Sequence, residues 1–242
     1  MSKLLIVGFL GGIPAGLLGL GGGVLFIPLM VYVAKLKMKE ITGVSSMAVA
    51  IVATVGSIRY ISEGYGLEAF IPYLIAGGIL GAIAGNQINK GLDNSSLKKI
   101  FSIVLLVTAI RMNFIVQGSG IASDNMLIYI VIGFVSGILA GLLGLGGGVV
   151  RIPALLIFAG VPSLVAQGAS LITSVPTAVA AAYPKVINSP IKIKQGLMLG
   201  GGGSLGVLIG SEIAFTLGDS SLKTIFSVFL FIVSIRMFFE KD

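Results

Sequence analysis

Long apolar runs, separated by short polar stretches, occupy almost the whole chain. Eight of them can be distinguished, at residues 4–33, 42–61, 69–88, 97–116, 126–158, 164–183, 196–217 and 222–239. Crossing a bilayer takes roughly 20 apolar residues of helix. Six runs have about that length, whereas 4–33 and 126–158 are longer than one span needs. The pattern predicts an all-α integral membrane protein.

Composition narrows the class further. The chain is 56% hydrophobic and 10% charged, against roughly 25% charged residues in soluble domains, so an ordinary water-soluble fold is excluded. It has no cysteine and no histidine, which removes disulfides, imidazole and thiolate metal sites, and most nucleophilic catalytic systems. No paired-carboxylate motif is evident either, so we expect neither an enzyme nor a metal or cofactor.

The chain is a tandem duplication. The segment Gly-Leu-Leu-Gly-Leu-Gly-Gly-Gly-Val runs from Gly16 to Val24 and recurs letter for letter from Gly141 to Val149, an offset of 125 residues. The same offset, without a gap, relates Pro28 to Pro153 and further matched residues up to the end of each half. We therefore predict a first transmembrane repeat at 1–116, a linker at 117–125 and a second repeat at 126–242.

The distribution of basic residues indicates how the halves are oriented. Net charge is +7, but the lysines lie in short loops, not on one face, so a topology signal explains them better than nucleic-acid binding. The Gly cluster and the following proline should break the first run of each half. If both broken runs re-enter as hairpins, the basic loops at 35–39, 90–99 and 185–194 and both termini fall on the cytoplasmic side. Each half then has three full spans, and the halves form an inverted repeat.

The repeated glycine motif is the main candidate for a binding site. Non-helical backbone at membrane depth survives only when buried in protein or lining a wet cavity. Glycines permit positive φ angles and let a ligand approach the bare main chain, and exposed amides beside a helix N-terminus attract anions. The alternative is that these glycines serve helix packing alone. A dinucleotide-binding loop is disfavoured, because the glycine spacing is wrong and no strand–helix alternation is present.

The doubled Gly-Leu-Leu-Gly-Leu-Gly-Gly-Gly motif with its following Ile-Pro, the Gly-Val-Ser-Ser at 43–46 and the Arg-Met ending of each half resemble the sulfite exporter TauE/SafE family. The resemblance covers essentially the whole chain. It implies a transporter of small sulfur-containing anions, such as sulfite or sulfonates, in a prokaryotic cytoplasmic membrane. It does not specify the anion, the direction of transport or the coupling ion.

Charged residues inside apolar runs are expensive and are functional candidates by default. Arg151 and Glu212 are the sharpest, because their partners at the 125-residue offset are the uncharged Phe26 and Gln87. Arg151 follows the second Gly motif within a turn, where a guanidinium could bind an oxyanion. The alternative is a structural ion pair between Arg151 and Glu212, and Glu212 could instead carry a proton.

The sequence thus predicts a secondary transporter that holds its anion between the two Gly loops and works by alternating access. An anion channel with the same site is the alternative. Hydroxyl and amide groups on the second run of each half would complete the site, although hydrogen bonding between helices is the favoured explanation for any single serine or threonine. The predicted partners are this small anion and membrane lipid, with the chain in the cell membrane. The predicted substrate-binding residues are Gly19, Gly21, Gly22, Gly23, Ser45, Ser46, Gly144, Gly146, Gly147, Gly148, Arg151, Gln167 and Ser170, with Glu212 as the candidate coupling residue.

Overall fold

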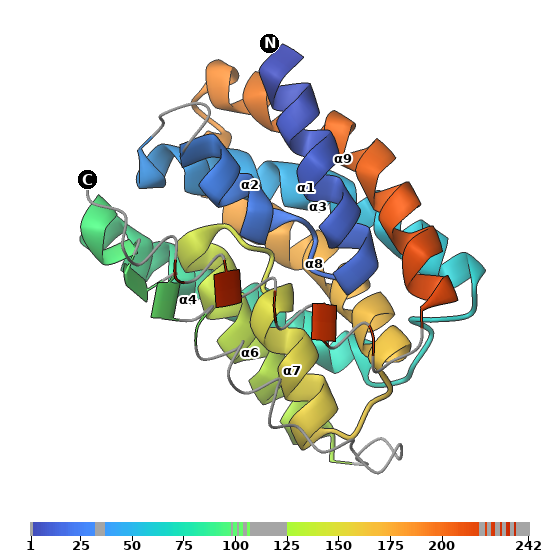
Figure 1. The fold of residues 1–242 in the computed structure, drawn as a ribbon. Coiled ribbons are helices and arrows are strands. Elements are labelled where there is room, and N and C mark those ends of the chain that lie inside the picture. Colours follow the sequence, from blue (N-terminus) through green and yellow to red (C-terminus); the bar gives the residue numbers. More distant parts are fainter. Residues whose placement is uncertain are drawn as a thin grey trace.

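The computed structural model is all-helical over the part of the chain that it describes, which comprises residues 2–31, 37–97 and 125–217 with scattered positions at 99–106 and 221–235 (Figure 1). The linker at 117–125, apart from Asn125, and most of the runs at 97–116 and 222–239 lie outside the described residues. The helices are α1 (Ser2–Leu18), α2 (Gly23–Leu29), α3 (Met38–Ser62), α4 (Ile71–Gly91), α6 (Met126–Leu143), α7 (Gly148–Phe158), α8 (Ser163–Val186) and α9 (Pro190–Thr216).

The first run of each half is broken at its glycines, as predicted. α1 ends at Leu18 and α2 begins at Gly23, and the same break separates α6 from α7. The expected contribution of the prolines was wrong, because Pro28 and Pro153 lie inside α2 and α7 without ending them. The ring of Phe26 reaches Gly11, although 15 residues of continuous helix would separate them by about 22 Å. α2 therefore folds back along α1.

Glycine seams join each half to the other. A Cβ at Gly8, Gly12 or Gly16 of α1 would collide with the α9 backbone, and one at Gly77, Gly81 or Gly85 of α4 would collide with α6. These two seams are equivalent under the 125-residue offset, and each pairs a helix of one half with a helix of the other. Small residues allow such close backbone approach in membrane proteins. Part of the glycine content is thus explained by packing, at positions other than the two Gly loops.

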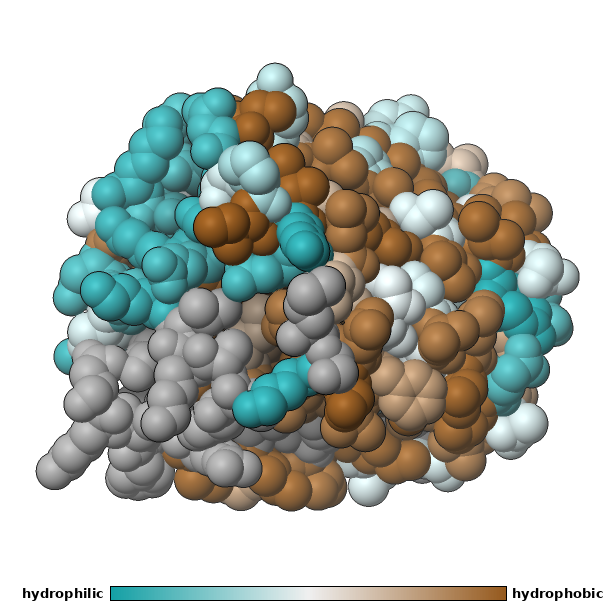
Figure 2. Space-filling view, turned by 90° about the horizontal axis from the view of Figure 1, so that it is seen from above, coloured by the Kyte–Doolittle hydropathy of each residue, from teal (hydrophilic) through white to brown (hydrophobic). Residues whose placement is uncertain are grey.

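Among the described residues, five helices are long and apolar enough to cross a membrane: α3, α4, α6, α8 and α9. The face shown in Figure 2 is hydrophobic across its middle and hydrophilic toward both sides. α6 is among the five, so the length of this first arm does not by itself require re-entry. Re-entry and inverted orientation stay predictions.

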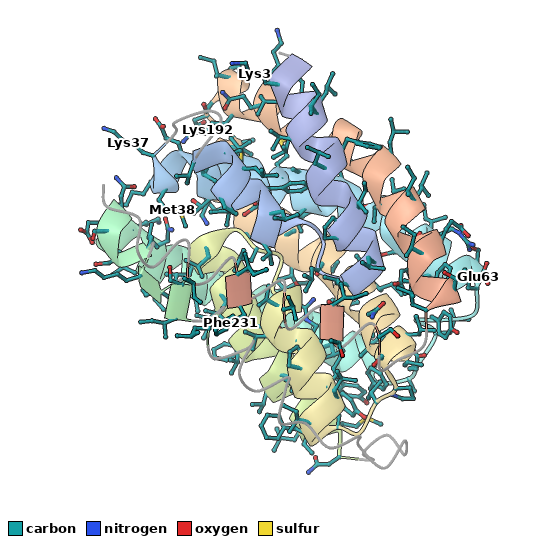
Figure 3. All side chains as sticks on the ribbon, viewed as in Figure 1. Lys3, Lys37, Met38, Glu63, Lys192 and Phe231 are labelled. Carbon is teal, nitrogen blue, oxygen red and sulfur yellow. The ribbon has the colours of Figure 1, made fainter. Side chains whose placement is uncertain are left out.

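Basic residues gather at one end of the molecule. Figure 3 places Lys3, Lys37 and Lys192 together at the upper left and Glu63 on the opposite side. The Nζ of Lys39 donates to the carbonyl of Lys90 at 3.4 Å, which ties the start of α3 to the end of α4. This clustering is what the positive-inside argument requires. The side of the membrane on which this end lies remains a prediction.

The third basic segment is not a loop, which corrects the sequence analysis. Lys185 lies in the last turn of α8, and Lys192 and Lys194 lie in the first turns of α9. Pro190 starts α9, where its fixed φ and missing N–H cost nothing, so only a three-residue connection separates the two helices. Hydropathy alone placed the boundary too late, because lysines are good helix formers.

Candidate functional site: two glycine loops and a buried arginine

The two Gly loops have the same backbone conformation and pack against each other. Gly19, Gly21 and Gly22 have φ angles of 67°, 70° and 88°, and their counterparts in the second loop, Gly144, Gly146 and Gly147, have 78°, 76° and 84°. L-residues other than glycine rarely adopt such angles. A Cβ at Gly23 would collide with Leu145 of the opposite loop, and one at Gly148 would press on Leu20. The loops therefore meet at one buried point.

Serine side chains of α3 and α8 donate hydrogen bonds to carbonyl groups of the loops. Ser45 Oγ donates to the carbonyl of Gly144 at 2.8 Å, and its counterpart Ser170 donates to the carbonyl of Gly19 at 3.0 Å. Ser174 Oγ donates to the carbonyl of Gly146 at 3.0 Å. Each loop is thus fixed by a serine from the other half of the chain.

The loop amides are left unused. Within the described residues, the N–H groups of Gly21, Gly22, Gly146 and Gly147 have no hydrogen-bond partner, although all four glycines are buried. Buried N–H groups in native proteins are nearly always paired, with protein, water or ligand. Because serine and arginine side chains bind the carbonyls of Gly19, Gly144 and Gly146, while these four amides stay free, the loops present positive partial charge. Such a surface favours an anion over a cation.

Arg151 adds a full positive charge beside the second loop. Its side chain is completely buried, and Nε donates to Ser136 Oγ at 3.1 Å, while Nη1 donates to the Ser170 carbonyl and Ser174 Oγ, each at 3.0 Å. Nη2 reaches the carbonyl of Gly146 at 3.4 Å. All of these acceptors are neutral. An isolated buried charge is costly, and within the described part of the chain no negative charge accompanies Arg151.

The proposed structural pair of Arg151 with Glu212 does not form, which corrects that alternative. Glu212 lies on α9 with 62% of its side chain exposed, and its Oε1 is 2.5 Å from Nε of Arg59. Arg59 also pairs with Glu63 at 2.6 Å. Glu212 therefore stands apart from the buried loops, and its assignment to coupling remains a prediction.

The first half is apolar where the second half is polar. Phe26 stands at the position of Arg151, Gly11 at that of Ser136 and Val49 at that of Ser174. The Phe26 ring fills the space where a Cβ of Gly11 would lie. The duplicated scaffold thus carries one polar cluster. Comparing the halves position by position would have found Ser136, which sequence analysis missed.

The other side chains that the sequence predicted to bind substrate have partners within the protein. Ser46 Oγ donates to the carbonyl of Thr42 in its own helix. Oε1 of Gln167 lies 2.6 Å from the hydroxyl oxygen of Tyr60, and the backbone of Gln167 lies against Gly19. Ser45 and Ser170 donate their hydroxyl protons to loop carbonyls. Direct contacts of these four side chains with a substrate stay predictions.

Two further residues were missed, and they are also counterparts. Tyr60 donates to the carbonyl of Gly16 at 2.9 Å, and Lys185 donates to the carbonyl of Gly141. Both carbonyls belong to the helix turn that precedes a Gly loop. A cation at the C-terminus of α6 is also favoured by the helix dipole. In the sequence analysis, Lys185 was counted with a basic loop and Tyr60 was not singled out.

No cluster of three or more His, Cys, Asp or Glu side chains is present among the described residues. What the fold and the site define together is a polytopic helical membrane protein with a buried, electropositive cluster of donors. The model of the sulfite exporter TauE/SafE family matches residues 1–112 and 129–242. The chain belongs to this family of membrane transporters.

Curated relatives agree with this membership. A probable membrane transporter protein of Methanocaldococcus jannaschii is 30% identical over 163 residues, which cover 64% of this chain and 61% of that protein. A probable membrane transporter protein of Xylella fastidiosa is 27% identical over 223 residues, or 86% of this chain and 84% of the relative. A third, from Bacillus subtilis, is 27% identical over 120 residues, 47% of this chain and 44% of its own length.

Proposed function

We propose that this protein is a secondary transporter that moves a small sulfur-containing anion, such as sulfite or a sulfonate, across the cell membrane by alternating access. The observation that carries the proposal is the imbalance of the buried site. Side-chain donors bind the loop carbonyls of Gly19, Gly144 and Gly146, four loop amides are free, and Arg151 is buried among neutral acceptors. An anion placed there would supply both the missing acceptors and the missing charge.

A sulfur oxyanion suits this set of donors. Its several oxygens can accept hydrogen bonds from amides and from a guanidinium at the same time. In the described residues, one N–H of Arg151 Nη2 remains without a partner, since the four hydrogen bonds above use four of its five donors. The first α7 turn begins at Gly148 and adds the positive end of a helix dipole. The sulfur specificity itself rests on the family description.

Alternating access would use the duplication. Reciprocal glycine seams and reciprocal serine bonds join the halves on both sides of the loops, as expected if the halves form an inverted repeat that rocks around a central site. A channel would need a continuous polar path with weak binding. The apolar Val49, which touches both Gly21 and Gly146, does not favour such a path.

The sharpest test gives the polar cluster the residues that stand at the equivalent positions of the first half. Arg151→Phe alone would press the ring on Ser136, because in the first half this space requires Gly11. The variant should therefore combine Arg151→Phe with Ser136→Gly. Replacing a buried charge by an apolar side chain of fitting shape is often neutral or stabilising. We expect this double variant to fold and to lose anion binding. Arg151→Lys should have intermediate affinity, because lysine keeps the charge but not the bidentate geometry.

The assay is uptake of radiolabelled sulfite, thiosulfate and a small sulfonate into proteoliposomes, with sulfate and acetate as controls and with or without a proton gradient. Saturable flux of a sulfur anion, abolished in the double variant, is the expected result. Equal flux in the double variant would refute the role of Arg151. Flux that rises linearly with concentration would favour the channel. Loss of gradient dependence in Glu212→Gln would support its coupling role, and unchanged dependence would remove it.

A further inference from the structure

A groove of about 540 Å³ runs between α4 and α8. From α4 it is lined by Ile79, Ile83, Asn86 and Gln87, and from α8 by Pro176, Val179, Ala180, Tyr183 and Pro184. Each wall covers nine residues of helix, and the eight steps between its ends amount to roughly 12 Å at about 1.5 Å per residue. One leaflet of the hydrocarbon core is about 15 Å deep. Both helices are candidate membrane spans, so the groove has the direction and the length of a lipid chain.

The walls are apolar at one end and polar at the other. Ile83 and Val179 are about half exposed, at 50% and 52%, so they face outward from the helix bundle. Asn86, Gln87 and Tyr183 follow them toward the ends of α4 at Gly91 and α8 at Val186. Helix ends with a tyrosine are typical of the membrane interface. The polarity of the groove therefore matches that of a lipid, with its head group at the helix ends.

Asn86 provides an unpaired acceptor in this groove. Pro184 lacks the N–H that would bond to the carbonyl of Ala180, and Asn86 Nδ2 donates to this carbonyl at 3.0 Å instead. The amide orientation is thereby fixed, and Oδ1 of Asn86 is left buried without a partner. Only 7% of Asn86 is exposed. A buried acceptor of this kind indicates a donor that binds there.

A cation lies at the same end. Nζ of Lys90 is 3.2 Å from Oε1 of Gln87, which lines the groove. Lys90 also accepts through its carbonyl from Lys39, so the polar end of the groove belongs to the basic end of the molecule. Clustered lysines beside a span attract anionic lipid head groups.

The duplication provides a comparison, because the equivalent interface between α9 and α3 is closed. Arg59 of α3 and Glu212 of α9 form an ion pair there, and the ring of Phe215 lies 4.8 Å from the Arg59 guanidinium. At the offset of 125 residues, the counterparts in the groove are Pro184, Gln87 and Lys90. The three residues that bridge α9 and α3 are thus replaced, between α4 and α8, by residues that leave the groove open. One of them, Lys90, places a cation at the polar end of the groove.

From this geometry we infer that the α4–α8 groove binds one anionic glycerophospholipid whose head group carries hydroxyls, as in phosphatidylglycerol. One acyl chain lies along Ile79, Ile83 and Val179. The phosphate faces Lys90, and a head-group hydroxyl donates to Oδ1 of Asn86. The lipid then links α4 to α8 as the ion pair links α9 to α3. The inference is independent of the transported substrate.

Native mass spectrometry of the purified protein tests this binding after reconstitution in nanodiscs of phosphatidylglycerol and phosphatidylcholine. Ile83→Trp fills the groove, and Leu208→Trp is the matched control at the equivalent position of the bridged interface. We expect one retained phosphatidylglycerol in the natural protein and in Leu208→Trp, and at least a tenfold loss of retention in Ile83→Trp. Lys90→Met, an exposed substitution that should leave the fold intact, should abolish the preference over phosphatidylcholine.

Three results would overturn the inference. The first is equal lipid retention in Ile83→Trp and the natural protein. The second is equal loss in Ile83→Trp and Leu208→Trp, which would mean that the lipid contacts many surface positions. The third is an unchanged preference for phosphatidylglycerol in the double variant Lys90→Met with Asn86→Leu. This variant removes both proposed head-group contacts without filling the groove.

Discussion

The Cα of Gly147 lies where no side chain fits. A Cβ built there would be 2.6 Å from the Ser136 carbonyl oxygen and 2.9 Å from Nη2 of Arg151, and φ is 84°. Gly147→Ala therefore combines a strained backbone with crowding of the guanidinium. Gly64→Ala separates the two effects, since Gly64 has a φ of 86° and nothing within 4 Å of its Cβ position.

The magnitudes can be worked out from these two sites. Left-handed backbone costs a non-glycine residue roughly 1–2 kcal/mol, and the reduced freedom of the unfolded chain offsets about 0.4–1 kcal/mol of it. Gly64→Ala should therefore destabilise by about 0–1.6 kcal/mol. Crowding in a packed core adds about 1–3 kcal/mol, so Gly147→Ala should cost about 1–5 kcal/mol in total.

Thermal unfolding of both variants in detergent, with and without sulfite, measures these effects. The midpoint should fall further for Gly147→Ala, by about 2–4 °C for each additional kcal/mol, and its shift on adding sulfite should be lost. Equal midpoints for Gly147→Ala and Gly64→Ala would refute the packing argument.

Three other substitutions probe the scaffold around the site by the same unfolding measurement. Gly206→Ala inserts a Cβ into the α1–α9 seam, whereas Gly201→Ala in the same helix meets nothing within 4 Å; the first should destabilise by about 1–3 kcal/mol more, and similar midpoints would contradict a tight seam. Tyr60→Phe removes the single buried hydroxyl that lies between the Gly16 carbonyl and Oε1 of Gln167 and should cost about 1–3 kcal/mol, while Tyr65→Phe should change little. Lys185→Met should destabilise by a similar amount, about 1–3 kcal/mol, and Lys185→Arg should partly restore the midpoint.

The fold was largely predictable because membrane spans and the duplication leave strong signals in sequence. Apolar runs of span length, the break at the repeated glycines and the correspondence of the halves all follow from local composition and the 125-residue offset. Helix ends were less accurate. α9 begins at Pro190, because the lysines that hydropathy assigned to a loop form its first turns.

The candidate site was only partly predictable, because hydrogen-bond direction is not encoded in residue type. Ser45 and Ser170 were expected as donors to an anion, but their protons go to loop carbonyls of the opposite half. Arg151 was found because a charge in an apolar run is conspicuous. Ser136 was missed because a single serine in a membrane helix is ordinary, and only the contact with Nε at 3.1 Å distinguishes it.

Departures from internal symmetry carry the information about function in this chain. Positions that are the same in both halves, such as the loop glycines and the glycine seams, build the scaffold, because both copies need the same backbone. Two groups of differing positions stand out among the described residues: Arg151 with Ser136 and Ser174 beside the loops, and Arg59 with Glu212 and Phe215 at one interface. The first group has apolar counterparts in the first half, and the second has counterparts that do not bridge α4 and α8. Each group is therefore a separate target for mutation.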